Sequence, residues 1–107
     1  MEHCDSEFAR ACRRFLHQHP ELSGQEYNTA KYIRDKLTEF GIEFQEVGGT
    51  GTFAWIKGDN DNGRRILLRA DIDALPIEEQ IVLPYKSVNP GVMHACGHDI
   101  HTAALLA

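Results

Sequence analysis

The sequence predicts an α/β fold in which two helices precede a mixed sheet with a β-hairpin and the start of a third helix. Apolar residues recur at helical spacing over residues 8–40 and then alternate or cluster as they do in strands. Near the end, a histidine-rich loop precedes a short run of alanine and leucine. With 107 residues, the chain suits one small domain.

A first helix is expected just after the N-terminus, where Asp5 or Ser6 can act as the N-cap. One apolar stripe then follows at helical spacing, formed by Phe8, Ala11, Cys12, Phe15 and Leu16. This stripe places Cys12 on the buried face, in a structural role. Pro20 disfavours helical geometry in the residue before it, so the helix should end near residues 17–18.

A second helix is expected from Ser23, because Ser23-Gly24-Gln25-Glu26 fits the capping box, in which Glu26 reaches back to the cap. Helical spacing continues through Tyr27, Ala30, Ile33, Leu37 and Phe40. Gly41 stands where a left-handed residue commonly ends a helix.

The hydrophobic period changes after this helix and predicts three strands. Residues 42–47 alternate in polarity, residues 53–56 form a short apolar run, and a glycine-rich turn separates the two. Residues 65–70 contain a continuous apolar run, which indicates a third strand buried on both faces. We expect the second and third strands to pair as the hairpin.

The third expected strand runs directly into Asp71-Ile72-Asp73. Carboxylates two residues apart in an extended segment point to the same side. At the carboxyl end of an α/β strand they would stand where ligands bind, and a nearby cation would relieve their repulsion. The alternative is a solvent-exposed strand end in which Asp73 forms a turn. Glu78 and Glu79, a little further on, are expected to be solvated.

The most specific pattern is Met93-His94-Ala95-Cys96-Gly97-His98-Asp99-Ile100-His101. It gathers thiol, imidazole and carboxylate groups, which are the ligands of zinc and related divalent ions. A turn signal precedes it and residues 102–107 have the composition of a helix start, so we expect a loop that leads into a helix. Gly97 would allow a tight turn. Each residue alone could be an ordinary surface histidine or buried cysteine, but the combined spacing favours metal binding.

Composition and charge narrow the classes of partner and location. The net charge is −5, and acidic residues lie close to both arginine doublets, so neither nucleic acid nor an anionic membrane is an expected partner. Three scattered cysteines form no disulfide framework, which indicates a reducing compartment. We find no signal-peptide pattern and no membrane-spanning run, so the expected location is the cytoplasm.

Three blocks of the sequence together resemble one known family. The blocks are RRFLHQHPELS at 13–23, RADIDALPI at 69–77 and NPGVMHACGHD at 89–99. They resemble the metal-dependent aminoacylase, hippurate hydrolase and auxin-conjugate hydrolase group. The blocks occur in order, the last two are highly specific, and the resemblance extends from about Phe8 to Ala107.

The resemblance implies a hydrolase that cleaves amide bonds in N-acyl amino acids or small peptides with two divalent ions, which could be zinc, manganese, cobalt or nickel. It implies that Cys96 and His98 are metal ligands and that Asp73 orients a ligand. Asp71 falls where related metallopeptidases have a metal-binding histidine. We therefore place it, together with Asp99 and His101, behind the ligands as candidate supporting residues.

The family's pattern continues beyond this chain. Its members are several times longer, and the glutamate that acts as base, further ligand histidines and the lid or dimerisation domain all lie past the position matching residue 107. We therefore expect residues 1–107 to be a partial catalytic domain, the N-terminal fragment of such an enzyme, and inactive alone. Two protein ligands leave a zinc site incomplete.

Two other functions remain open at this point. The chain could be a non-catalytic metal-binding or interaction module, in which open sheet edges pair with a partner or a second copy. Alternatively, Cys96 could be a nucleophile with His98 or His101 as its base. The nucleophile hypothesis leaves the pair Asp71 and Asp73 unexplained.

Overall fold

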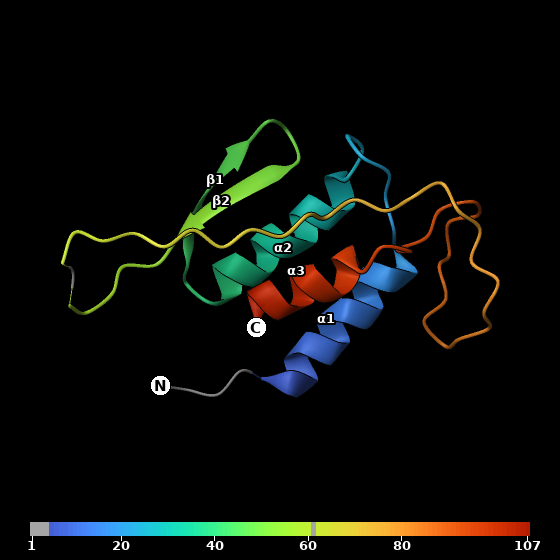
Figure 1. Cartoon of the computed structure of the whole chain (residues 1–107), viewed down its shortest axis with the longest axis horizontal. Helices are drawn as coiled ribbons and strands as arrows, with labels where there is room; N and C mark the ends of the chain where they lie inside the picture. Colours follow the sequence, from blue (N-terminus) through green and yellow to red (C-terminus); the bar gives the residue numbers. More distant parts are fainter. Residues whose placement is uncertain (1–4, 61) are drawn as a thin grey trace.

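The computed structural model describes residues 5–60 and 62–107. In chain order the elements are α1 (Ser6–Gln18), α2 (Tyr27–Glu39), β1 (Glu43–Val47), β2 (Gly51–Trp55) and α3 (His98–Leu106). Figure 1 shows the three helices side by side, the hairpin near α2, and a long extended segment that crosses from the loop after β2 to the loops on the right. α3 comes last in the chain but packs mainly against α1.

The first helix is confirmed within the described residues. Asp5 is its N-cap, and its Oδ1 accepts hydrogen bonds from the amides of Glu7 (3.1 Å) and Phe8 (3.0 Å). α1 ends at Gln18, two residues before Pro20, as expected. Cys12 is buried as its place on the apolar stripe requires.

The expected capping box of the second helix is wrong, because α2 begins at Tyr27. The amide of Gln25 instead bonds to the carbonyl of Leu22 (2.9 Å), which closes a turn with Gly24 in the left-handed region (φ 82°). The carboxylate of Glu21 takes over the capping role: its Oε1 accepts from the amide and the hydroxyl of Thr29, both at 2.6 Å. At the other end Gly41 adopts φ 70°, which confirms the left-handed helix end.

The hairpin forms between different strands from those expected. β1 pairs with β2 in antiparallel register, from Glu43 opposite Trp55 to Val47 opposite Gly51. The short turn at 48–50 can reverse the chain tightly because Gly48 (φ 61°) and Gly49 (φ 85°) adopt left-handed geometry. The loop that follows β2 is longer, and residues 65–70 after it do not pair with β2.

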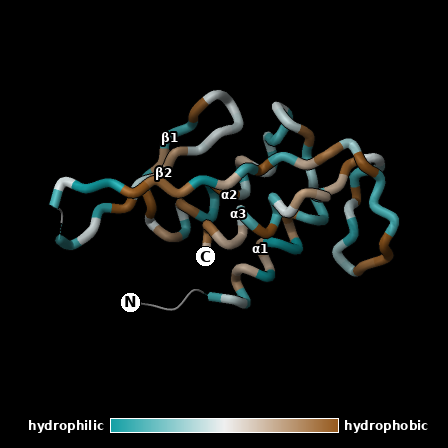
Figure 2. The backbone as a smooth tube through the Cα atoms, in the orientation of Figure 1, coloured by the Kyte–Doolittle hydropathy of each residue, from teal (hydrophilic) through white to brown (hydrophobic). Residues whose placement is uncertain are grey.

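Residues 65–70 are extended but form no strand with another described segment, so the sheet in this part of the chain is two-stranded and antiparallel. Ile66, Leu67 and Leu68 are 90%, 77% and 69% exposed, which contradicts the expected burial of this run on both faces. Figure 2 shows apolar colour along this exposed crossing segment. The α/β class holds, but the apolar run has no neighbour among the described residues to cover it.

Two isolated bridges hold the segment after the crossing in place. Ala74 pairs with Leu22 in parallel, and Leu75 pairs with Met93 in antiparallel orientation. The Leu75 and Met93 backbones exchange hydrogen bonds of 2.9 and 3.0 Å. These bridges bring the acidic segment 71–73 beside the histidine-rich stretch. In residues 5–60 and 62–107, no helix is both long and apolar enough to cross a membrane.

Candidate metal centre

His98 occupies the first position of α3 and is therefore placed by a helix rather than by the loop expected there. Gly97 precedes it with φ 83°, so the chain turns sharply into the helix at a geometry that suits glycine. The His98 ring is partly buried, and its Nδ1 lies 2.9 Å from both the backbone oxygen and the Oδ1 of Asp73. Two acceptors at Nδ1 favour a proton there, which leaves the lone pair on Nε2.

Asp71 and Asp73 both lie near the His98 ring, each at a different ring nitrogen. Asp73 bonds to Nδ1, while the Oδ2 of Asp71 lies 4.0 Å from Nε2. The other oxygen of Asp71 pairs with exposed Arg69. The backbone oxygen of Asp71 accepts a hydrogen bond from the Thr102 hydroxyl at 3.0 Å, which holds this segment against the first turns of α3. A cation at Nε2 would thus find a carboxylate nearby.

Two further candidate donors, Cys96 and His101, lie close to His98 in sequence. The thiol of Cys96 is free and exposed. His101 is also exposed, and its ring centroid lies 6.2 Å from that of His98. A free thiol and an imidazole nitrogen are donors that fit zinc-like ions. Among the residues that the structure describes, however, no group of three or more His, Cys, Asp or Glu side chains converges as a metal cage. The thiol and imidazole donors in these residues would therefore supply only part of the ligand set of a metal centre.

The comparisons with known proteins decide the family. The sequence profile of "Peptidase family M20/M25/M40" matches residues 67–107, which include the aspartate pair and the whole histidine-rich stretch. An N-acetyl-L-cysteine deacetylase of Bacillus subtilis is 57% identical over 95 residues, and a hippurate hydrolase of Campylobacter jejuni is 50% identical over 95 residues. Residues 67–107 match the peptidase family M20/M25/M40. The predicted resemblance is confirmed.

The solved structure of a dinuclear metal binding M20 peptidase from Bacillus subtilis shares the fold of this chain. The TM-score is 0.87 and the sequences are 52% identical, over 95% of this chain and 30% of the other. The two enzymes named above are matched over 88% of this chain, but only over 23% and 24% of their own lengths. The chain therefore spans about a quarter of the curated relatives it matches.

Asp99, a candidate supporting residue behind the ligands, bonds to residues of α1 and not to His98. It is 1% exposed, and its Oδ2 accepts hydrogen bonds from the Nε of Arg13 and the Nδ1 of His17, both at 2.9 Å. Its neighbour His98 faces the opposite partner, Asp73. The first turn of α3 is thus held from two sides through adjacent residues.

Glu79 is buried, which overturns the expectation that it is solvated. It is 3% exposed, its Oε2 lies 2.6 Å from the Nε2 of His17, and its Oε1 accepts from the amide of Ser87 at 2.7 Å. Burial raises the pKa of Glu79, but the hydrogen bonds from His17 and Ser87 outweigh burial and hold that pKa below its ordinary value. Glu78, next to it in sequence, remains exposed.

His17 and His94 are buried histidines for which no individual role was predicted, although both lie in the sequence blocks described above. His17 lies one helical turn after Arg13, and this i, i+4 spacing is the only local sign that the two act together. His94 is 5% exposed, and neither of its ring nitrogens has a hydrogen-bond partner among the described residues. Burial lowers the pKa of His94, partly offset by the charge of Asp99, which favours a neutral ring.

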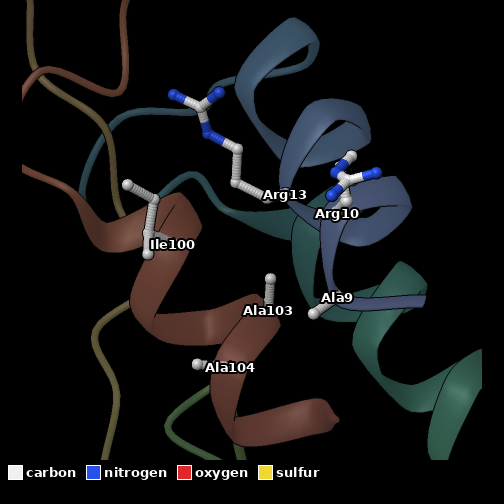
Figure 3. A pocket seen from close by; sticks show the side chains of 6 residues that line it. All are labelled: Ala9, Arg10, Arg13, Ile100, Ala103 and Ala104. Carbon is white, nitrogen blue, oxygen red and sulfur yellow. The ribbon is translucent and has the colours of Figure 1, made fainter. Parts of the chain in front are cut away.

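Residues of α1 and α3 line a small hollow with a volume of about 220 Å³ (Figure 3). Its walls are the alanines of the two helices and Ile100, while Arg10 and Arg13 extend along its rim. The hollow has no acidic or histidine lining, so it is separate in character from the metal-binding surface. Ala103, which lines it, is buried and shows how closely the two helices pack.

Proposed function

We propose that this chain is the N-terminal part of the catalytic domain of a dinuclear metal-dependent amidohydrolase. Its substrates are N-acyl amino acids or small peptides, from which the enzyme releases an amino acid and a carboxylic acid. The named relatives support this class: they include an N-acetyl-L-cysteine deacetylase, an N-acyl-L-amino acid amidohydrolase and a hippurate hydrolase.

The observation that carries the proposal is the state of His98. Its Nδ1 is engaged by Asp73 while Nε2 stays available, which is the arrangement in which a carboxylate orients a metal-binding imidazole. Cys96, two residues earlier, supplies an exposed thiol that can bind as thiolate. We assign Cys96 and His98 as ligands and Asp73 as the residue that orients His98. Asp71, beside Nε2, adds negative charge at the site.

The metal pair, when bound, would supply a more acidic water and polarise the scissile carbonyl. The residues of this chain would bind the ions, fix the His98 tautomer and present the site at the start of α3. The proton acceptor is not assigned to any residue here: Glu79 is buried against His17, and Glu78 accepts a hydrogen bond from the Gly91 amide. The chain alone should therefore lack activity.

A chimaeric enzyme tests this function. Residues 1–107 would replace the matched segment of the Bacillus subtilis dinuclear peptidase, which is 52% identical to this chain. We expect the chimaera to hydrolyse N-acetyl or N-benzoyl amino acids, to lose activity with a chelator, and to lose it in Cys96→Ser and His98→Ala. Asp35→Ala, an exposed position on α2, is the matched control and should keep activity. If the folded chimaera kept its activity in Cys96→Ser and His98→Ala, the assignment of these two residues as metal ligands would be refuted.

A non-catalytic interaction module is the second candidate, favoured by one observation. The exposed apolar run at 66–68 could pair with a partner or a second copy of the chain. Sedimentation of the 107-residue chain tests whether this apolar run is an association surface. Tight self-association that survives Leu67→Lys would count against this surface, and its loss in Leu67→Lys would support it.

A further inference from the structure

His17 lies where three segments of the chain meet. Its ring is 2% exposed, with Nδ1 against Asp99 of α3 and Nε2 against Glu79 of the loop at 77–92. Arg13 approaches the same Asp99 oxygen from the preceding turn of α1. Tyr85 closes the cluster: its ring meets His17 edge-on, with 5.7 Å between ring centroids, and the Arg13 guanidinium lies 5.1 Å from its centre.

Hydrogen bonding and charge both favour a doubly protonated His17. A neutral imidazole donates from only one nitrogen, so its other nitrogen would turn a lone pair toward a carboxylate. With protons on both nitrogens, His17 donates to Asp99 and to Glu79. The two carboxylates then directly contact two positive groups, buried His17 and partly exposed Arg13, while Lys86 near Glu79 and Arg14 over the Tyr85 ring lie at the edge of the cluster. An unbalanced buried charge is strongly unfavourable, so the balanced state is preferred.

The start of α3 depends on this cluster because it has no side-chain cap. Its N-cap is Gly97, which offers no side-chain hydrogen bond to the first turn. The turn is held instead through His98 on one side and Asp99 on the other. These two residues are adjacent, so a rotation of the turn that released Asp99 would also redirect the His98 ring.

The same cluster also orders the loop that leads into the histidine-rich stretch. One carboxylate oxygen of Glu79 accepts a hydrogen bond from the Ser87 amide, and the other bonds to the Nε2 of His17. The Ser87 hydroxyl then donates to the backbone oxygen of Val92 at 2.7 Å, directly before residues 93–97. His17 therefore links α1 to both approaches to the candidate metal centre.

We propose that His17 is a positioning residue of the metal centre, which as an imidazolium joins Asp99 to Glu79 and thereby fixes the direction of His98. This role rests on the proposed function, because it gives His98 the part of a metal ligand. Its consequence is that a fully buried side chain of α1, remote in sequence from the ligands, controls metal affinity.

Nitrogen-15 spectroscopy of the 107-residue chain at pH 7 tests the protonation state. We expect N–H protons on both ring nitrogens of His17. Glu79→Gln is the informative variant, since its amide can donate to Nε2 while Nδ1 still donates to Asp99, and every hydrogen bond is kept with a neutral ring. That variant should stay folded and lose one of the two N–H signals. A single N–H in the wild type, or two in folded Glu79→Gln, would overturn the charge-balance argument.

Cobalt binding tests the positioning role. Co²⁺ is titrated into the chain, and the thiolate-to-cobalt absorption band is assigned to Cys96 by its loss in Cys96→Ser. His17→Gln should weaken cobalt binding by about 10- to 100-fold, the range for partners behind metal ligands. Leu37→Ala, a core substitution on α2, controls for general destabilisation and should keep the wild-type affinity.

The possible failures are distinguishable. Wild-type cobalt affinity in His17→Gln would overturn the positioning role and leave the proposed metal centre intact. A wild-type chain without any Cys96-dependent cobalt band would contradict the proposed centre itself, and with it the positioning role.

Discussion

Replacing Asp73 with alanine should weaken metal binding only moderately, and the structure explains why. The substitution removes the Oδ1 that lies 2.9 Å from the Nδ1 of His98. The backbone oxygen of residue 73 lies at the same distance and remains. The proton should therefore stay on Nδ1, and Nε2 should still face the metal. What is lost is the negative charge behind the ring.

The expected magnitude follows from that remaining contact. Partners of this kind typically contribute 10- to 100-fold to metal affinity. Because the backbone acceptor survives, we expect the lower end for Asp73→Ala, about tenfold or ~1.4 kcal/mol. Asp73→Asn, whose amide oxygen can still accept from Nδ1, should lose less than the alanine variant.

A chelator competition with Zn²⁺ measures these affinities in the 107-residue chain. Asp35→Ala is the control, since Asp35 is an exposed carboxylate on α2 that pairs with Lys31. An affinity loss well above 100-fold in Asp73→Ala would mean that Asp73 binds the ion directly. An unchanged affinity would remove Asp73 from the site.

Three further predictions concern stability. Leu16→Ala, at a fully buried position of α1, should lower the free energy of unfolding by about 2–5 kcal/mol in urea denaturation, and a loss below about 1 kcal/mol would mean that α1 is not packed as described. Gly97→Ala should lower the free energy of unfolding by about 1–2 kcal/mol, because alanine is strained at φ 83°. The added Cβ would lie 3.8 Å from the His101 ring, an ordinary contact, so no clash adds to this loss. An unchanged urea midpoint would argue against the left-handed turn. The pKa of Glu79 is lowered in the folded state, so its stabilisation is present above the unfolded value of 4.5 and disappears as pH falls through the folded pKa. The urea midpoint should accordingly fall more steeply on acidification below about pH 4.5 in the wild type than in Glu79→Gln, and parallel curves would contradict the lowered pKa.

The helices were the most predictable part of the fold, because their signals are local. The cap at Asp5, the apolar stripe of α1 and the left-handed Gly41 are each determined by neighbouring residues. The start of α2 was less predictable for a specific reason. Ser23 and Glu26 have the spacing of a capping box, but Gly24 and Gln25 form a turn between them, and the capping carboxylate comes from Glu21.

The strand pairing could not be deduced from hydrophobic pattern alone. A continuous apolar run such as 66–68 indicates burial, but burial requires a covering element, and no described segment provides one. Turn chemistry was the better guide to the hairpin: two left-handed glycines favour the tight reversal at 48–50 over the longer loop after β2.

At the candidate site, too, some contacts were indicated by the sequence blocks, and others arise only from the tertiary packing. The resemblance, and not the spacing, indicated that Asp73 orients a ligand, and in the structure Asp73 and Asp71 both lie near the His98 ring. The partners of Asp99 and Glu79 were not predictable, since the contacts with His17 span 82 and 62 residues. In sequence Glu78 and Glu79 look equivalent, and only the tertiary packing makes one of them buried.

X-ray absorption at the zinc edge tests the central claim, that Cys96 and His98 bind the metal, most directly. The measurement uses the zinc-loaded 107-residue chain with Cys4→Ser and, at the buried position, Cys12→Ala, so that Cys96 is the sole thiol. We expect one sulfur scatterer at about 2.3 Å together with imidazole nitrogen at about 2.0–2.1 Å. A spectrum with bound zinc but only oxygen and nitrogen neighbours would contradict the assignment of Cys96 as a ligand.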